Sequence, residues 1–182
     1  MSVRYGLIPI PAPPASPYLS APGFAPGAPA IPYVAQSETN WCWAACGEML
    51  LHLPGKISRS QCQLANAQFG PNCCSMPHAP PSCDKGQWPY VAYPPLGLPT
   101  ATVQRSLTIP EIRAELQGGK PVQVCYQWTG GNQTHVALIV DEHPNGDFEV
   151  HDPDRFRGAG PRSHGQLLSA YGGGTWILSF TF

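Results

Sequence analysis

The sequence has little charge and no long apolar run, and each of these absences excludes a class of protein. Only 12% of its 182 residues are charged, and ten Lys and Arg nearly balance eleven Asp and Glu. An ordinary soluble domain has about 25% charged residues, and a protein that binds nucleic acid through its phosphates needs a basic excess. No apolar segment approaches the roughly 20 residues of a membrane-spanning helix, and residues 136–140 suffice only for a strand. We therefore expect neither a nucleic-acid-binding protein nor a transmembrane span.

The N-terminus also lacks the continuous apolar segment of a secretory signal peptide. Prolines from Pro9 onward interrupt the apolar residues that follow Arg4, and residues 1–32 hold nine of the 23 prolines. This composition predicts an extended, polyproline-like tail or linker, with a docking segment for a partner's aromatic groove as the alternative. We expect residues 33–182 to form the folded domain. Any export is expected to use a route other than a clear classical signal peptide.

Helix and strand signals occupy different halves of the chain. Apolar residues recur at three- and four-residue steps in residues 42–53, which indicates a helix that ends at Pro54, and a capping box at Thr108 begins a second, short helix. Residues 61–98 are rich in Cys and Pro and predict irregular structure held by cross-links. Antiparallel strands are predicted at residues 122–128, 135–140, 148–151 and 176–182. These halves together indicate an α+β protein.

Cys42 is the candidate nucleophile. It lies at the predicted start of the first helix, which Thr39 or Asn40 is expected to cap. Unsatisfied backbone amides and the positive end of the helix dipole favour a thiolate at this position. The seven cysteines are an odd number, so at least one lacks an intramolecular partner. From position alone, a buried structural cysteine or half of a disulfide explains Cys42 equally well.

A cysteine nucleophile needs a histidine base and a third group that orients the ring. His135 opens an apolar strand, and the chain then turns at residues 143–146 and returns as a strand that ends in Asp152. If Asp141 pairs near Gly146 or Asp147, position 152 or 153 lies opposite His135. We therefore expect the Asp152 carboxylate to accept the Nδ1 proton of the imidazole. His151 points to the opposite face of the strand, which argues against it as the base.

These residues resemble the papain-like cysteine peptidases, in particular the compact bacterial members that include secreted effector proteases. The matching features are Cys42-Trp43-Ala44, Gln36 six residues before the cysteine, and the downstream His135 and Asp152. The resemblance covers residues 33–182 and implies a helical lobe that carries the nucleophile, packed on an antiparallel β-sheet or barrel lobe. It also implies a catalytic triad of Cys42, His135 and Asp152, with Gln36 and the Cys42 backbone N–H as oxyanion donors.

Three features depart from the papain pattern. Trp41 precedes Cys42 where papain has a small residue, the histidine lies only 135 − 42 = 93 residues downstream, and Asp152 replaces an asparagine. The short spacing implies missing loops. A carboxylate holds an imidazolium more strongly than a carboxamide does. Trp176 is our candidate for the tryptophan that shields the His–Asn pair in papain.

The other six cysteines leave several pairings open. Three disulfides among them permit 15 connectivities, and Cys125, on a predicted strand, is alternatively a buried thiol. In papain-like enzymes a cross-link often joins the nucleophile helix to the Cys-rich loop after it, so the resemblance implies that Cys46 pairs with Cys73, Cys74 or Cys83. A zinc site formed by Cys62, Cys73, Cys74, His78 and Cys83 is the alternative, although adjacent cysteines do not match the usual ligand spacing. We expect no metal and no cofactor.

The function predicted from the resemblance is hydrolysis of peptide bonds in a protein or peptide substrate. The low charge and the Cys- and Pro-rich loop fit an enzyme that is secreted or delivered outside the producing cell, such as an effector or toxin. An inhibitory or immunity protein is then a further candidate partner. Two alternatives stay open: a peptidoglycan amidase, endopeptidase or protein deamidase with the same triad, and a non-enzymatic, disulfide-rich interaction module whose tail recruits a partner.

Overall fold

The computed structural model describes residues 30–74 and 77–182. The expected Pro-rich tail of residues 1–32 therefore lies almost entirely outside the described residues. Ile31 is only 5% exposed and packs in the core with residues of the first helix. The packed part of the chain thus includes a residue two positions before Tyr33, where the sequence places the start of the domain.

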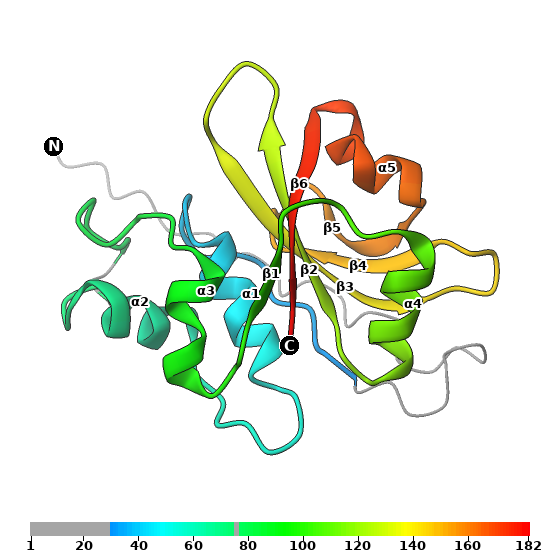
Figure 1. Cartoon of the computed structure of the whole chain (residues 1–182). Helices are drawn as coiled ribbons and strands as arrows, with labels where there is room; N and C mark the ends of the chain where they lie inside the picture. Colours follow the sequence, from blue (N-terminus) through cyan, green and yellow to red (C-terminus); the bar gives the residue numbers. More distant parts are fainter. Residues whose placement is uncertain (1–29, 75–76) are drawn as a thin grey trace, which may run out of the picture.

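A six-stranded antiparallel sheet in the order β1-β6-β2-β3-β4-β5 forms the centre of the fold (Figure 1). Its strands are β1 Ala101–Val103, β2 Val122–Trp128, β3 Thr134–Glu142, β4 Phe148–Asp152, β5 Gly158–Arg162 and β6 Gly174–Thr181. The sequence predicts β2, β3, β4 and β6 but neither of the two edge strands. β1 has three residues, and β5 has the sequence GAGPR without a β-branched or aromatic residue. Both therefore lack the pattern by which strands are recognised.

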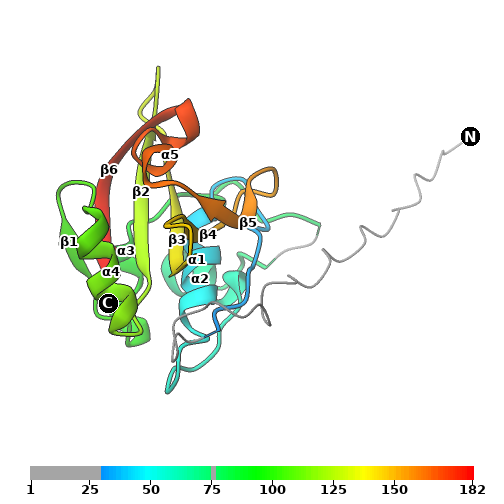
Figure 2. The same ribbon diagram turned by 90° about the vertical axis from the view of Figure 1, so that its right-hand side faces the viewer.

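Helices cover both faces of this sheet. On one face lie α1 Cys42–Leu50, α2 Gln61–Phe69, α3 Pro89–Ala92 and the 3₁₀ turn η2 Pro94–Leu96; on the other lie α4 Ile109–Gln117, α5 His164–Leu168 and the 3₁₀ turn η3 Ala170–Gly172. The turned view in Figure 2 shows α1 and α4 on opposite sides of β2. Each face has its own apolar cluster, so the fold has two cores separated by the sheet. The predicted α+β class is confirmed.

The ends of the helices differ in part from the sequence expectations. α1 begins at Cys42 but ends at Leu50, and its N-cap is Trp41 without a side-chain capping bond. The expectation that Thr39 or Asn40 caps this helix is therefore wrong. The prediction of irregular structure for residues 61–98 is also wrong where α2 lies. Ser60 and Gln63 form a capping box that starts this helix.

The loop of residues 83–85 holds the beginning of α1 in place. The carboxylate of Asp84 accepts a hydrogen bond from the Asn40 backbone N–H at 2.8 Å. The indole N–H groups of Trp41 and Trp43 donate to the backbone carbonyls of Cys83 and Lys85, each at 2.9 Å. The helix start is therefore fixed by a neighbouring loop rather than by a local cap.

Two disulfides cross-link the Cys-rich segment that follows α1. Cys62–Cys74 joins α2 to the residues after it, and Cys73–Cys83 joins those residues to the loop of residues 83–85. Cys42, Cys46 and Cys125 are free thiols. The implied disulfide from Cys46 to the Cys-rich loop is wrong, because Cys46 is fully buried in the core with its Sγ 3.6 Å from the Val136 carbonyl oxygen. All four cysteines of the alternative zinc site are used in the two disulfides. Within the described ranges, no group of three or more His, Cys, Asp or Glu is arranged to hold a metal ion.

The register of β3 and β4 differs from the predicted one. Leu138 pairs with His151, and a register shift after Ile139 makes Asp141 pair with Glu149 rather than with a residue of the turn. Extending the pairing of Leu138 places Asp152 beside Ala137, two residues from His135 and on the same face of the sheet. The two side chains are therefore diagonal neighbours, which long side chains can still bridge.

No helix in the part of the chain that the structure describes has the length and apolar character needed to span a bilayer.

The two disulfides provide a matched test of what holds the start of α1. They join residues separated by 10 and 12 positions, so replacing either pair by serine is expected to lower the free energy of unfolding by roughly 3 kcal/mol. Urea unfolding measures that loss. Only the variant Cys73→Ser/Cys83→Ser is expected to speed hydrogen exchange at the amides of residues 40–46. Equal exchange in both variants would contradict the anchoring role of the loop.

Candidate active site

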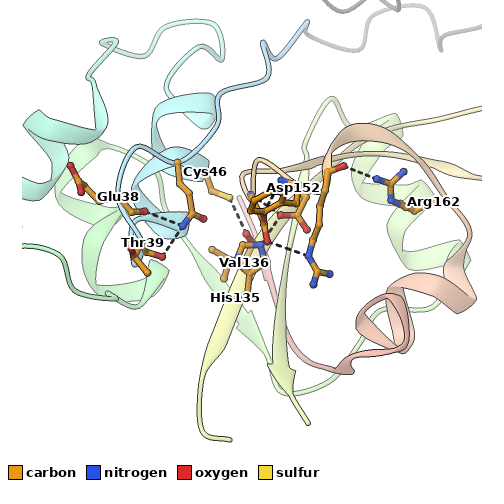
Figure 3. A network of polar contacts seen from close by, with 11 residues as sticks. Glu38, Thr39, Cys46, His135, Val136, Asp152 and Arg162 are labelled. Carbon is orange, nitrogen blue, oxygen red and sulfur yellow. Dashed lines mark hydrogen bonds and ion pairs between the residues drawn. The ribbon is translucent and has the colours of Figure 1, made fainter. Parts of the chain in front are cut away.

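His135 and Asp152 form a buried hydrogen-bonded pair at the ends of β3 and β4. The Nε2 atom of His135 lies 2.7 Å from Oδ1 of Asp152, and these residues are 8% and 0% exposed. Oδ1 also accepts a hydrogen bond from the backbone N–H of Asp154 at 2.9 Å. Figure 3 shows the pair next to the start of α1, near Glu38 and Thr39. The sequence expectation that Nδ1 faces the carboxylate is wrong, because Nε2 takes that position.

Cys42 lies on the other side of the His135 ring. It is the first residue of α1 and is partly exposed, so a substrate can reach its thiol. Its thiol acts on His135 and raises the pKa of that ring, and Nδ1 is the ring nitrogen that Asp152 leaves free. The three side chains come from α1, β3 and β4, and His135 lies between the other two.

The surroundings of His135 favour its protonated form. Burial by itself lowers the pKa of this imidazole, but the hydrogen bonds and charges of Asp152 and Cys42 outweigh it and raise the pKa to about 10. Because this value exceeds the unperturbed 6.5, the protonated pair stabilises the folded chain fully below about pH 6.5. That contribution is lost as the pH rises through about 10.

Trp128 covers the His135 ring. The two rings stack with their centroids 5.8 Å apart and 27° between their planes, and the Arg157 guanidinium lies 4.4 Å from the centroid of the indole on which it stacks. Trp176, our candidate for this role, instead packs in the core between α5 and the sheet, and its indole N–H donates to the Leu178 carbonyl. The sequence did contain a signal for Trp128 in this role. It stands at the end of β2, and β2 forms a hairpin with β3, the strand that carries His135.

Gln36 lies just before α1, and its carboxamide makes bonds within its own loop. Its Nε2 donates to the backbone carbonyls of Glu38 at 3.0 Å and Thr39 at 2.7 Å. Its Oε1 is buried and has no hydrogen-bond partner among the residues described. The first amides of α1, including that of Cys42, have no acceptor within the helix. The Gln36 carboxamide thus bonds the segment that leads into Cys42.

The backbone around Gln36 is held from two sides. Gln61, at the start of α2, is 6% exposed and uses its carboxamide to bond both neighbours of Gln36. Its Nε2 donates to the Ala35 carbonyl and its Oε1 accepts from the Ser37 N–H, each at 2.9 Å. From the other side, the Gln36 N–H donates to the Pro153 carbonyl at 2.9 Å. Sequence reasoning missed Gln61, because no local pattern links it to residue 36.

Other candidate nucleophiles and bases are placed differently. Burial lowers the pKa of His151 to about 4, and its ring packs edge-on against Tyr33. Burial raises the pKa of Cys46 well above its ordinary value and that of Cys125 to about 12. Thiols with such values stay protonated at neutral pH and react slowly. Cys42 is thus the one free thiol that is both partly exposed and paired with a histidine in the described part of the chain.

Solved structures with a similar fold include two cysteine peptidase domains. The peptidase domain of Streptococcus ComA, a bifunctional ABC transporter involved in quorum sensing, aligns with a TM-score of 0.57 and 16% identity over 83% of this chain and 96% of that one. A putative C39-like peptidase from Bacillus anthracis aligns with a TM-score of 0.51 and 16% identity over 83% and 93% of the two chains. At this identity the likeness shows the fold. A search of curated proteins finds no match.

A family model described as "Papain-like cysteine protease AvrRpt2" matches residues 27–164. The match includes Gln36, Cys42, His135 and Asp152 and spans well over half of the chain. The predicted resemblance to papain-like cysteine peptidases is therefore confirmed, and so is the expected class of enzyme. The chain belongs to the family of papain-like cysteine proteases that this model describes.

Proposed function

We propose that this protease hydrolyses peptide bonds with Cys42 as nucleophile, His135 as general acid and base, and Asp152 as the group that orients the imidazole. The observation that carries the proposal is that one buried ring bonds Asp152 at 2.7 Å and is also acted on by the Cys42 thiol, which raises its pKa. A raised pKa keeps that ring protonated at neutral pH. An imidazolium next to a thiol favours the thiolate, which is the reactive form of cysteine.

The reaction then follows from the positions of these groups. The Cys42 thiolate attacks the carbonyl carbon of the substrate, so that a C–S bond forms and the carbonyl oxygen becomes negative. When this intermediate collapses, the C–N bond breaks and His135 gives its Nδ1 proton to the leaving amine. Neutral His135 next removes a proton from water, whose oxygen attacks the thioester carbon. The C–S bond then breaks, the acyl half leaves as a carboxylic acid, and the Cys42 thiolate and protonated His135 are restored. Nε2 stays bonded to Asp152 throughout, which fixes the ring orientation.

The oxyanion requires donors that point at it in the transition state. The Cys42 backbone N–H has no acceptor within α1, and Gln36 lies in the loop that precedes it. Because the Gln36 Nε2 donates to two backbone carbonyls, Glu38 and Thr39, the proposal requires that one of its hydrogens turns to the oxyanion as substrate binds. The other can remain on one of those carbonyls, while Gln61 keeps the backbone in place.

Delivery outside the producing cell fits this chemistry. Disulfides such as Cys62–Cys74 and Cys73–Cys83 persist in oxidising environments and are rare in the cytosol. The compact bacterial papain-like peptidases that the sequence resembles include secreted effectors, and the chain belongs to a papain-like cysteine protease family. We therefore propose a secreted or delivered effector or toxin that cuts proteins, with an inhibitory or immunity protein as a further partner. Gel filtration of the protease with lysate from its producer tests for such a partner.

Incubation with two kinds of substrate tests the activity. We expect the full chain to cut an unfolded, carboxymethylated protein at peptide bonds and the Cys42→Ala variant to leave it intact, with the new termini read by mass spectrometry. Purified peptidoglycan is expected to stay uncut. Cleavage of peptidoglycan alone would instead favour the amidase or endopeptidase alternative. Cleavage of neither, with an unreactive Cys42, would favour the interaction module.

The charge of Asp152 predicts a specific change in pH dependence. In Asp152→Asn the carboxamide no longer raises the pKa of His135, while burial still lowers it. The alkaline limb of kcat/KM is therefore expected to move down by about 1–3 pH units. Asp154→Asn is the matched control, because its carboxylate bonds Arg157 and a backbone amide of its own turn. An alkaline limb that stays in place in Asp152→Asn would refute the orienting role.

Gln36→Ala separates oxyanion stabilisation from thiolate formation. Loss of one oxyanion donor typically lowers kcat by about 10²–10³-fold, so we expect a loss of that order in peptide hydrolysis. Alkylation of Cys42 by iodoacetamide forms no oxyanion and is expected to proceed at the wild-type rate. Steady-state kinetics and mass-spectrometric labelling measure the two effects. Parallel loss of both would show that Gln36 acts on the thiol instead.

A further inference from the structure

Three buried polar atoms without a hydrogen-bond partner belong to Asp152 and to two tyrosines on which its charge acts. They are the carboxylate Oδ2 of Asp152 and the hydroxyls of Tyr126 and Tyr171, and they make up half of the six such atoms in the described part of the chain. The rings of Tyr126 and Tyr171 meet edge to face at 5.5 Å. Native proteins leave few buried polar groups unpaired. Three such groups, one of them on a candidate catalytic carboxylate, therefore call for an explanation.

The backbone of Tyr171 is strained in the same place. Ala170 and Tyr171 have φ angles of 44° and 60°, and no other non-glycine residue in the described ranges has a positive φ. A bulky side chain rarely adopts this left-handed conformation, and such strain persists only where the surroundings enforce it. Here the Ser169 hydroxyl accepts a bond from the Gly172 N–H at 3.2 Å, which closes the turn around both residues.

Two arginines fix the Tyr171 ring. The guanidinium of Arg157 lies 4.9 Å from the ring centroid and that of Arg162 lies 5.6 Å from it. Arg157 also stacks on Trp128, which covers His135. The ring of Tyr171 is therefore tied to the same layer of side chains as the candidate base, and its hydroxyl is close enough to Asp152 for the carboxylate to raise its pKa.

The geometry points to Tyr171 as a positioning residue for the catalytic pair: its hydroxyl donates to Oδ2 of Asp152, and the Tyr126 hydroxyl donates to that of Tyr171. The inference rests on the proposed catalytic role of Asp152 and His135. A neutral phenol can donate and an ionised carboxylate can only accept, so the direction of the chain of bonds is fixed.

The titration behaviour of Tyr171 agrees with this arrangement. Burial raises the pKa of its hydroxyl first, and the negative charge of Asp152 raises it further, so the phenol stays neutral and keeps its proton to donate. The pKa of Tyr126 is raised by burial and by Tyr171. Both hydroxyls therefore remain donors throughout the pH range in which a protease works.

Donation from Tyr171 changes what Asp152 does to His135. A hydrogen bond to the free carboxylate oxygen withdraws negative charge and also fixes the plane of the carboxylate. Removal of the hydroxyl therefore makes Asp152 attract the His135 proton more strongly, which raises the pKa of His135, while the looser carboxylate orients the ring less well. The groups that interact with the pair in addition are Cys42, Cys46, Tyr33 and the backbone N–H of Asp154. Arg157 acts on the Tyr126 hydroxyl and Arg162 on that of Tyr171. A variant that removes only the Tyr171 hydroxyl leaves all six of these residues unchanged.

Tyr171→Phe is the sharpest test, because it keeps the ring that the arginines cover and removes only the hydroxyl. Nitrogen-15 NMR of the histidine rings follows the His135 midpoint in the full chain, with the signal assigned by His135→Gln. We expect the midpoint to rise by about half a unit to one unit, as for the loss of a charge-assisted hydrogen bond, and kcat/KM to fall roughly tenfold, as outer-shell losses do. Tyr93→Phe is the matched control, because it removes a buried hydroxyl that donates to the Trp43 carbonyl at 2.7 Å. It is expected to lower Tm without moving the midpoint.

The two readouts separate the two proposals. The NMR midpoint needs no turnover, so a wild-type chain that cuts no peptide would overturn the proposed function. An unchanged or lowered midpoint in folded Tyr171→Phe would overturn the positioning role. If that variant does not fold, Tyr126→Phe is expected to raise the midpoint in the same direction by a smaller amount, and a midpoint equal to that of the wild type would again overturn it.

Discussion

The proposed chemistry requires His135 to contact two side chains that belong to different parts of the fold, and the position of α1 against the sheet decides whether it can. Asp152 reaches the ring from the neighbouring strand β4, within the sheet, at 2.7 Å. Cys42 reaches it from α1, which packs on one face of the sheet. A shift of α1 against the sheet would separate thiol and imidazole while leaving both cores packed. The relative position of helix and sheet is therefore the constraint on which the chemistry depends.

Several features far apart in the sequence fix that position. The loop of residues 83–85, tied down by the Cys73–Cys83 disulfide, binds the start of α1. Gln61 holds the segment before the helix, and Pro153, directly after Asp152, bonds the backbone of Gln36. Each contact joins the segment that carries Cys42 to something outside it. The site is thus assembled by non-local hydrogen bonds, while the two apolar cores provide the stability behind it.

The sequence was sufficient for the parts of the site that a local pattern defines. Cys42 stands at the start of an amphipathic helix, and the hairpin that carries His135 and Asp152 is visible from its strands and turn. The register shift after Ile139 and the ring nitrogen that faces Asp152 depend on backbone geometry that strand patterns do not encode. Trp128 and Gln61 were missed for a related reason, since their roles come from tertiary packing.

The rate at which iodoacetamide labels Cys42 at pH 6 tests the central claim most directly. A cysteine with the ordinary pKa of about 8.5 is less than roughly 1% thiolate at that pH. If His135 holds the thiol as a thiolate, the wild-type chain will label at least about tenfold faster than His135→Ala. Equal rates in the two proteins, with both folded, would contradict the account.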